Sequence, residues 1–240
     1  ADQKFGHLAR KIWTLVKNAR GPRYDQGQER ISVSERSTTA IRLEKSGGKF
    51  DARRRELADA ALEAIATSGY ARTGLREIAA RAELTHGILH YYFDDKDDLI
   101  AQAVWQYKSE CARRYDPILE TATSSQEFVT RLTAEMARTM STETDMHRLW
   151  YDLRNQPLFD SGFSATIIAI DDLLADMVFA IITRFAELSG AEVRVSRDEA
   201  YALFDGVFLG ALIAFIRGNL DAPAELRARA ARLLASATAS

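Results

Sequence analysis

The stretch that decides the fold is residues 73–98, TGLREIAARAELTHGILHYYFDDKDD. In its first half Leu75, Ile78 and Ala79 recur at the spacing of one helix face, which predicts that this face is buried. The hydroxyl of Thr73 can cap the start of this helix by accepting a backbone hydrogen bond. The first half is therefore expected to form a short amphipathic helix.

The second half repeats the pattern after a break. Residues 82–84 are expected to form a tight turn, and Thr85 can cap a second helix from His86 to Tyr92. Leu89 and Phe93 are four residues apart and would hold this helix against the core. Two short helices joined by a tight turn make a helix-turn-helix, a motif that places its second helix in the major groove of DNA.

Further residues match a known pattern in order and spacing across residues 55–99. They are Ala60, Ala61, Leu62, Thr73, Ile78, Ala79, Gly87, Leu89, Tyr92, Phe93, Lys96 and Leu99. With them the segment resembles the DNA-binding domain of the TetR family of transcriptional regulators. The resemblance implies a homodimer with an all-helical ligand-binding body, and repression that a small molecule relieves.

Two residues depart from the family pattern. The turn position that the family usually fills with glycine is Glu83, and a left-handed backbone there would strain a glutamate more than a glycine. The first residue of the usual aromatic pair is His90, which could make a pH-sensitive contact with a phosphate or a base edge.

The residues that contact DNA are expected on the second helix and at polar or basic positions around it. Residues 85–92 contain no lysine or arginine, so the neutralisation of phosphates must come from neighbouring segments. The expected set is Arg53, Arg54, Arg55, Arg72, Thr73, Thr85, His86, Gly87, Ile88, His90, Tyr91 and Lys96.

Charge is distributed unevenly along the 240 residues. Residues 1–55 hold 14 of the 32 basic and 6 of the 34 acidic side chains, a net charge of +8, whereas the remainder carries −10. Positive charge just ahead of the motif would attract DNA and the acidic remainder would be repelled, which should orient the molecule.

Residues 1–50 are expected to be a basic, flexible extension, because residues 23–50 are polar and have no clear period. Two interpretations stay open for it: an arm that tracks phosphates or enters the minor groove, or an extension without a specific role. Residues 5–16 could also form an amphipathic helix for a membrane surface or a partner, although no membrane partner is expected.

Downstream of the motif the periodicity is helical throughout, and no strong strand signal is present. We expect an all-α fold in which residues 51–97 form the DNA-binding domain and residues 98–240 form a helical ligand-binding and dimerisation domain. Helices are expected at about residues 96–114, 124–140, 145–155, 161–188 and 197–217, with a last one after Asp221.

Two of these helices carry the pattern of an interface. Residues 161–188 bear a continuous apolar stripe, and small side chains recur every four positions along residues 197–217. With their symmetry mates they are expected to form a four-helix dimer interface, the alternative being a packing seam within one chain. The expected interface residues are Ile170, Leu174, Met177, Ile181, Ala202, Gly206, Gly210 and Ala214.

A ligand site is expected among the apolar and aromatic side chains of the body, each of which could equally be ordinary core. The candidates are Trp105, Phe128, Leu132, Met136, Met140, His147, Trp150, Tyr151, Arg154, Phe163, Ile167 and Phe208. Met136 and Met140 could form an adaptable wall. Trp150 and Tyr151 could present aromatic faces to an apolar or cationic ligand.

No pattern supports an enzyme, because the sequence has no nucleophile motif and no phosphate-binding glycine loop. No cofactor and no metal are expected, although His86 and His90 have the spacing of a two-histidine metal pair, which leaves metal sensing open. The single cysteine, Cys111, excludes an internal disulfide. Nothing reads as a signal peptide or a membrane span, so a cytoplasmic location is expected.

The sequence therefore predicts a DNA-binding transcriptional regulator. The favoured form is a homodimeric repressor that binds a two-fold symmetric double-stranded DNA operator and is released by a small-molecule inducer of unknown identity. Ligand and DNA would weaken each other's binding by the same factor. The alternative is an activator, or a regulator that binds DNA independently of any ligand.

Overall fold

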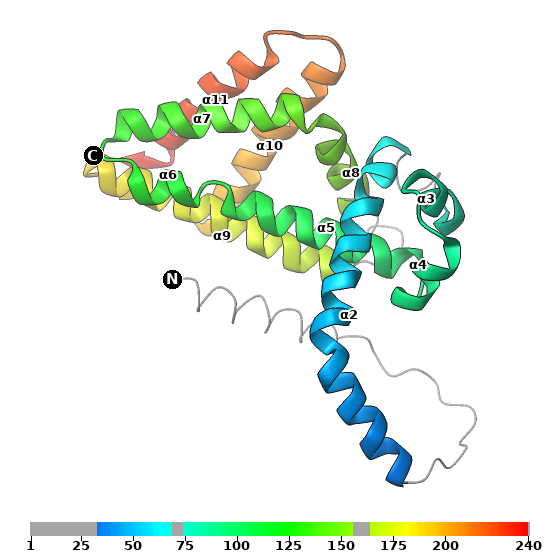
Figure 1. Ribbon diagram of the computed structural model, residues 1–240. Coiled ribbons are helices and arrows are strands. Elements are labelled where there is room, and N and C mark those ends of the chain that lie inside the picture. The colour runs from blue at the N-terminus through cyan, green and yellow to red at the C-terminus, as the bar shows by residue number, and fades with distance from the viewer. Residues whose placement is uncertain (1–32, 69–73, 156–163, 240) are drawn as a thin grey trace. The chain divides into compact units, whose positions relative to one another are not determined.

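The computed structural model describes residues 33–68, 74–155 and 164–239, the side chains of residues 33–47, 67, 68 and 164 excepted. The expected all-α fold is confirmed (Figure 1). The helices are α2 (Val33–Ser68), α3 (Leu75–Arg81), α4 (His86–Tyr92), α5 (Lys96–Arg113), α6 (Asp116–Thr121), α7 (Ser125–Thr142), α8 (Thr144–Arg154), α9 (Ser164–Ser189), α10 (Arg197–Ile216) and α11 (Ala222–Ser236).

Three features of this architecture were not expected. Helix α2 begins at Val33, although we expected residues 23–50 to be flexible, and residues 1–32 of that extension lie outside the described residues. The strands β1 (Glu192–Val193) and β2 (Thr238–Ala239) pair antiparallel, with Glu192 opposite Ala239. Two residues are too short to leave an alternating pattern in a sequence. Helix α6 begins around Pro117, which we had taken only as the end of the preceding helix. Proline fits the first turn of a helix because the amide that it lacks has no partner there.

The chain divides into two compact units. The first comprises residues 1–104 with 160–169, and the second comprises residues 105–159 with 170–240. The boundaries fall within α5 and within α9, so each of these helices contributes residues to both units. The boundary that we expected after residue 97 precedes the observed one by about two turns of α5.

The first unit packs α3 and α4 on α2 around a small apolar core. Leu57, Ile65, Ile78, Leu89 and Phe93 are each at most 1% exposed. These side chains recur at helical spacing, so each of the short helices buries the face that the sequence pattern predicts. A seven-residue helix is marginal by itself, and this burial is what stabilises α3 and α4.

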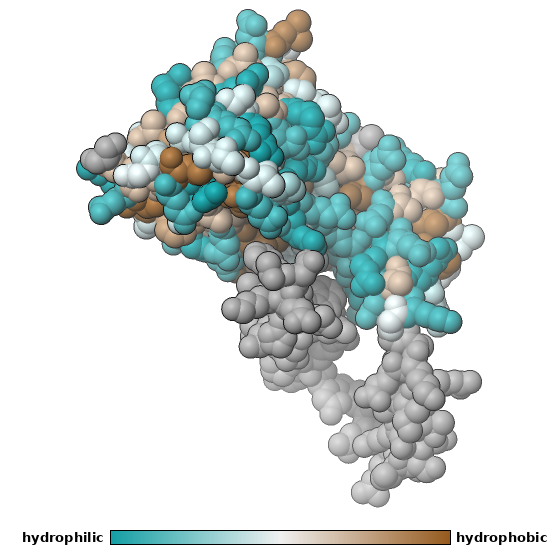
Figure 2. Space-filling model, turned by 60° about the vertical axis from the view of Figure 1, so that its left-hand side comes forward, coloured by the Kyte–Doolittle hydropathy of each residue, from teal (hydrophilic) through white to brown (hydrophobic). Residues whose placement is uncertain are grey.

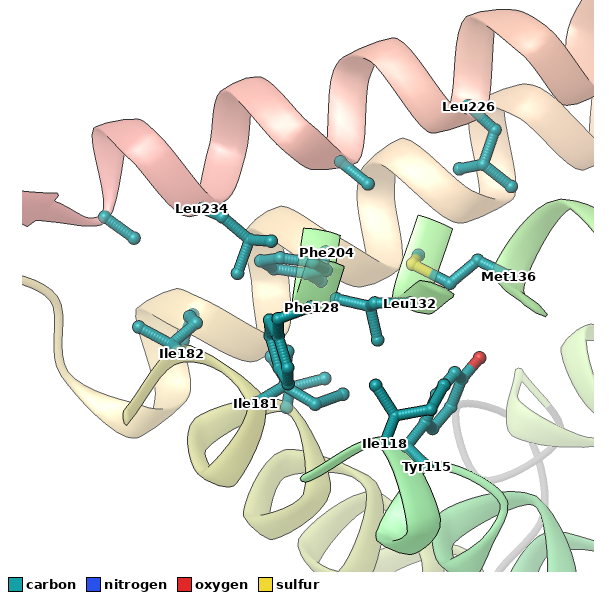
Figure 3. Close-up of a cluster of buried hydrophobic side chains, with 14 of the residues drawn as sticks. Tyr115, Ile118, Phe128, Leu132, Met136, Ile181, Ile182, Phe204, Leu226 and Leu234 are labelled. Atoms are coloured by element: carbon teal, nitrogen blue, oxygen red, sulfur yellow. The ribbon is translucent and has the colours of Figure 1, made fainter. Parts of the chain in front are cut away.

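The second unit is built around a larger core, part of which is drawn in Figure 3. Leu226 and Leu234 of α11 point toward Phe128 and Leu132 of α7, with Ile181 of α9 nearby. The spacing of four residues along α7 and of eight along α11 places each pair on a single helix face. Packing between helices therefore holds this unit together.

Helix α10 is unusual because it is apolar yet poorly covered. Among the described residues it is the one helix long and apolar enough, by length and composition, to span a membrane, and 22% of its 18-residue apolar window is buried in the protomer. Figure 2 shows a molecular face that is largely hydrophilic with hydrophobic residues interspersed. The exposed large side chains of α10 are Leu203, Ile213 and Ile216.

Candidate functional site

The helix-turn-helix begins with a backbone cap. Gly74 precedes α3 in an extended conformation, and its amide donates a hydrogen bond to the Glu77 carboxylate. This contact is one half of a capping box and fixes the first turn of α3. Thr73, which we expected to cap this helix, and Arg72 both lie outside the described residues.

The turn between α3 and α4 is closed by backbone hydrogen bonds and contains a left-handed residue. The amide of Leu84 donates to the carbonyl of Ala79 over 2.8 Å. Glu83 has a φ of 55°, the one positive φ of a non-glycine residue in the described ranges. The turn thus demands the conformation that glycine adopts without cost, and glutamate adopts it under strain.

Helix α4 has the bounds that the sequence predicts and presents its polar face outward. The hydroxyl of Thr85 accepts a hydrogen bond from the Ile88 amide over 3.3 Å, as expected for its cap. Tyr91 is 71% exposed, and Thr85, Gly87 and His90 are also exposed, whereas His86 and Ile88 are half-buried. Since Leu89 is fully buried, the exposed side chains of α4 lie away from the core, where another molecule can reach them.

Two histidines form a close pair on this surface. Their Nε2 atoms, on His86 and His90, lie 3.1 Å apart. Desolvation, and then the positive charges of His90 and Arg76, lower the pKa of His86. In the described part of the chain no group of three or more His, Cys, Asp or Glu side chains could hold a metal ion, so this pair gains no further ligand there.

The three arginines before the motif have different surroundings. Arg54 pairs with Asp98, both side chains being at most 13% exposed, and its guanidinium lies 5.0 Å from the centre of the Phe93 ring. It therefore joins α2 to the start of α5, where we had expected a phosphate contact. Arg53 is exposed and pairs with Glu56 over 2.8 Å. The other two expected basic contacts are Arg55, which is exposed, and Lys96, which is half-buried.

Phe50 and Arg76 belong to this region and were missed by the sequence analysis. The ring of Phe50 lies 4.8 Å from that of Tyr92 and 6.1 Å from that of Tyr91, so α2 supports the aromatic end of α4. We had placed Phe50 in the flexible extension. Phe50 could have been predicted, because it lies seven residues before the buried Leu57 and so on the same face of a helix.

The second unit contains a cavity of about 100 Å³ lined by α5, α7, α8, α9 and α10. Five of the expected ligand residues line it: Met136, His147, Trp150, Tyr151 and Phe208. Three others, Phe128, Leu132 and Met140, are fully buried in the core cluster. The half-buried Trp105, the buried Ile167 and Arg154 are not part of the lining, and Phe163 lies outside the described residues.

A buried lysine in the cavity wall was missed by the sequence analysis. Lys108 of α5 is 4% exposed, and burial lowers its pKa to about 8. Its ammonium lies 4.9 Å from the centre of the Trp150 ring and 5.4 Å from that of Tyr107. Lysine is rarely buried without a partner, so this position is costly for the fold.

A buried histidine lies in the same wall. His147 of α8 is 6% exposed, and burial, followed by the positive charges of Lys108 and Arg114, lowers its pKa to about 3. The imidazole is therefore neutral near pH 7. Its Nε2 is buried and has no hydrogen-bonding partner among the described residues.

The other charged side chains around the cavity pair with one another. Asp205 accepts a hydrogen bond from Tyr151 over 2.9 Å and pairs with Arg154, which also pairs with Asp171 over 2.9 Å. Burial, and then the Asp205 carboxylate, raises the pKa of Tyr151. This network joins α8, α9 and α10 on one side of the cavity.

A second network lies on the α5 side of the cavity. Glu143 accepts hydrogen bonds from Arg114 and from Tyr107, each over 2.8 Å. Arg114 and Arg154 thus both have ion-pair partners. Of the lysine and arginine side chains that line the cavity, Lys108 is the one without an ion pair in the described structure.

Residues 57–103, which run from α2 through the helix-turn-helix into α5, match the model of a family described as bacterial regulatory proteins, tetR family. These residues therefore carry the DNA-binding region of the TetR family. Relatives of the chain include the HTH-type transcriptional regulator PksA of Bacillus subtilis, which is 25% identical over 174 residues, 70% of this chain and 83% of PksA. The chain therefore carries a DNA-binding helix-turn-helix of the TetR type and is related to transcriptional regulators.

Solved structures show the same fold along most of this chain. A TetR transcription regulator from Haloarcula marismortui superposes with a TM-score of 0.64 at 18% identity, covering 78% of this chain and all of that one. The regulator FadR of Bacillus subtilis, solved with stearoyl-CoA, has a TM-score of 0.56 at 17% identity, covering 75% and 97% of the two chains. The likeness therefore includes the helical body as well as the DNA-binding motif.

Proposed function

We propose that this TetR-family regulator is a homodimeric repressor, acting in the cytoplasm, whose operator binding is relieved by a small molecule in the cavity of the second unit. The observation that carries the proposal is the cavity itself, because it has an apolar wall with a few buried polar groups, the usual composition of a ligand site. The FadR structure, of the same fold, was solved with a bound ligand.

DNA reading is assigned to the exposed face of α4. Thr85, His90 and Tyr91 are exposed on a helix whose opposite face is buried, and Arg76 and Arg53 are exposed near the motif. Side chains of this kind can reach base edges and phosphates from the major groove. We expect Tyr91 to contribute most, since it is the most exposed large side chain of the helix.

Dimerisation is assigned to α10. A Cβ atom built on Gly206 or Gly210 meets no atom within 4 Å in the protomer, so these glycines serve no packing within one chain. Together with the exposed Ala202, Leu203 and Ile213 they form one apolar face, which we call the α10 face. Glycines at four-residue spacing let a second helix approach closely, and an uncovered apolar helix is stabilised by such a partner.

The apolar stripe of α9, which we expected in the dimer interface, is assigned to the ligand site and the core. Ile170, Leu174 and Ile181 are at most 8% exposed within the protomer, and Leu174, Met177 and Ile181 line the cavity. These side chains are therefore assigned to the ligand site and the core, and the interface is assigned to the α10 face, where the small residues lie. The partly buried Ala214 lies at its edge.

The proposed mechanism is linkage through α5. This helix begins three residues after Phe93, and further along it carries Lys108 and Cys111 of the cavity wall. A ligand that fits one position of α5 better than another would favour one spacing between the two α4 helices of the dimer. Operator half-sites lie about 34 Å apart or a multiple of this, so a changed spacing weakens binding.

The dimer and the DNA reading are tested separately. Gly210→Glu should convert the dimer to a monomer in sedimentation velocity, while Gly48→Glu, at another helical glycine with open space around it, should leave it dimeric. Dimerisation of the Gly210 variant would reject the α10 face. The protein should bind specifically to the DNA upstream of its own coding region. Tyr91→Ala should weaken this binding, and the monomeric Gly210→Glu variant should lose it.

A further inference from the structure

The cavity wall holds two polar groups that have no hydrogen-bonding partner in the described structure. One is the ammonium of Lys108, which lies near the rings of Trp150 and Tyr107. The other is Nε2 of His147. A buried polar group without a partner costs free energy, so a protein retains such groups where a bound molecule supplies the partner.

The lysine of the cavity wall can bind an anion. Arg114 pairs with Glu143, and Arg154 pairs with both Asp171 and Asp205. Lys108 forms no ion pair in the described structure, and its ammonium lies in a buried surrounding of low dielectric, where an opposite charge is strongly attracted. One ammonium without an ion pair matches a single carboxylate, and the nearby charges of Asp205 and Glu143 would repel a dianion such as phosphate.

A cationic ligand fits this wall poorly. The aromatic face that could attract a cation is that of Trp150, and the Lys108 ammonium already lies 4.9 Å from its centre. A second cation would be repelled by the first. The acid of the wall, Asp205, is already engaged by Arg154 and Tyr151.

The second polar group of the cavity selects a hydrogen-bond donor. A hydrogen bond with the backbone of Thr139 favours a proton on one ring nitrogen of His147. Because the imidazole is neutral, its other nitrogen, Nε2, carries a lone pair and accepts a hydrogen bond. An O–H or N–H group on the ligand would satisfy it.

The rest of the cavity is apolar and small. Leu174, Met177, Phe204 and Phe208 supply most of its hydrocarbon surface. Its volume of about 100 Å³ is of the order of the ~150 Å³ cavity that holds benzene in an engineered protein. A single ring or a short chain is therefore the scale of ligand that it admits.

We propose that the ligand is a small apolar monocarboxylate that also carries a hydroxyl or N–H donor, with its carboxylate on Lys108 and its donor on Nε2 of His147. This assignment rests on the proposed function, because it names the ligand class of the same cavity. The assignment states which class of ligand the cavity binds, and it does not depend on whether the ligand changes DNA binding.

The test is calorimetric titration of the full chain with matched probes. Benzoate should bind, and benzamide and benzyltrimethylammonium should bind at least tenfold more weakly. Among 2-, 3- and 4-hydroxybenzoate at least one should bind more tightly than benzoate, because the ring position of the donor decides whether it reaches the histidine. The proposal is overturned if no carboxylate binds up to about 10 mM, or if the amide or the cation binds as well as benzoate.

Two variants assign the contacts. Lys108→Met should abolish the preference for benzoate over benzamide, and Lys49→Met, at an exposed lysine, should keep it. His147→Phe should keep benzoate binding and lose the gain from the hydroxyl. Melting curves of each variant establish folding before titration. An anion preference that survives in Lys108→Met would assign the charge recognition to another group and refute the proposal.

Operator binding by the ligand-free protein is measured in parallel, by fluorescence anisotropy. If benzoates bind and DNA binding is unchanged, the ligand class stands and the proposed relief of repression fails. If no probe binds while operator binding is intact, the ligand class fails and the DNA-binding function stands.

Discussion

Replacing Lys108 by methionine is expected to stabilise the protein. Burial lowers the pKa of this lysine from 10.5 to about 8, which corresponds to about 3 kcal/mol at 1.36 kcal/mol per pKa unit. The attraction between its ammonium and the Trp150 ring offsets about 1–2 kcal/mol of this cost. Methionine has a similar length and no charge, so the free energy of unfolding should rise by about 1–2 kcal/mol at pH 7.

The stabilisation should depend on pH in a defined direction. Between pH 8 and 10.5 the unfolded chain holds the lysine proton and the folded chain has released it, so the stability of the wild type rises with pH in this window. The difference between variant and wild type is therefore full below pH 8 and disappears above about pH 10.5. The charged and titratable groups around the lysine are Tyr107, Cys111, Arg114, Glu143, His147 and Asp205, and they are common to both proteins.

The assay is urea unfolding of both proteins from pH 7 to pH 10.5, followed by tryptophan fluorescence and circular dichroism at one protein concentration, since dimerisation adds to stability. Lys49→Met is the control and should change little. A Lys108→Met protein that is less stable than wild type at pH 7, or whose stability difference is independent of pH, would refute the claim that this lysine is buried at a cost.

Three further outcomes follow from the structure. Glu83→Gly removes a left-handed glutamate and should raise the free energy of unfolding by about 0.5–1 kcal/mol with DNA affinity unchanged, and a loss of stability in thermal melts would contradict the strain. Arg54→Met removes the guanidinium that pairs with Asp98 and should cost about 1–3 kcal/mol, and a double-mutant cycle with Asp98→Asn should show coupling between the two side chains. Benzoate affinity should be constant below pH 8 and fall above it as Lys108 loses its proton, whereas an affinity that rises above pH 8 would exclude pairing with the lysine.

The helix-turn-helix could be predicted closely because its signals are local. Thr85 caps α4 through its hydroxyl, and the buried pair Leu89 and Phe93 fixes the inner face of the motif. The left-handed turn at Glu83 was also identifiable as a departure from the glycine of the family. These features depend on residues a few positions apart, which a sequence displays directly.

The cavity could be predicted only in part because its wall is assembled from distant helices. The five aromatic, histidine and methionine side chains were found by residue type, but Lys108 was not, since a lysine on a helix is normally solvated. The stripe of α9 was predicted correctly as apolar, yet nothing in its period distinguishes a surface that faces a partner from one that faces a cavity. Leu174 and Ile181 face the cavity.

The most direct test of the central claim is the binding of the purified protein to a labelled duplex from the DNA upstream of its own coding region, with a random duplex at the same salt concentration as the control. We predict specific binding that Tyr91→Ala weakens at least fivefold, as expected for the loss of a base contact, and that Lys108→Met leaves intact in the absence of ligand. Equal affinity for both duplexes, or specific binding that the Tyr91 variant retains in full, would contradict the assignment of DNA reading to α4.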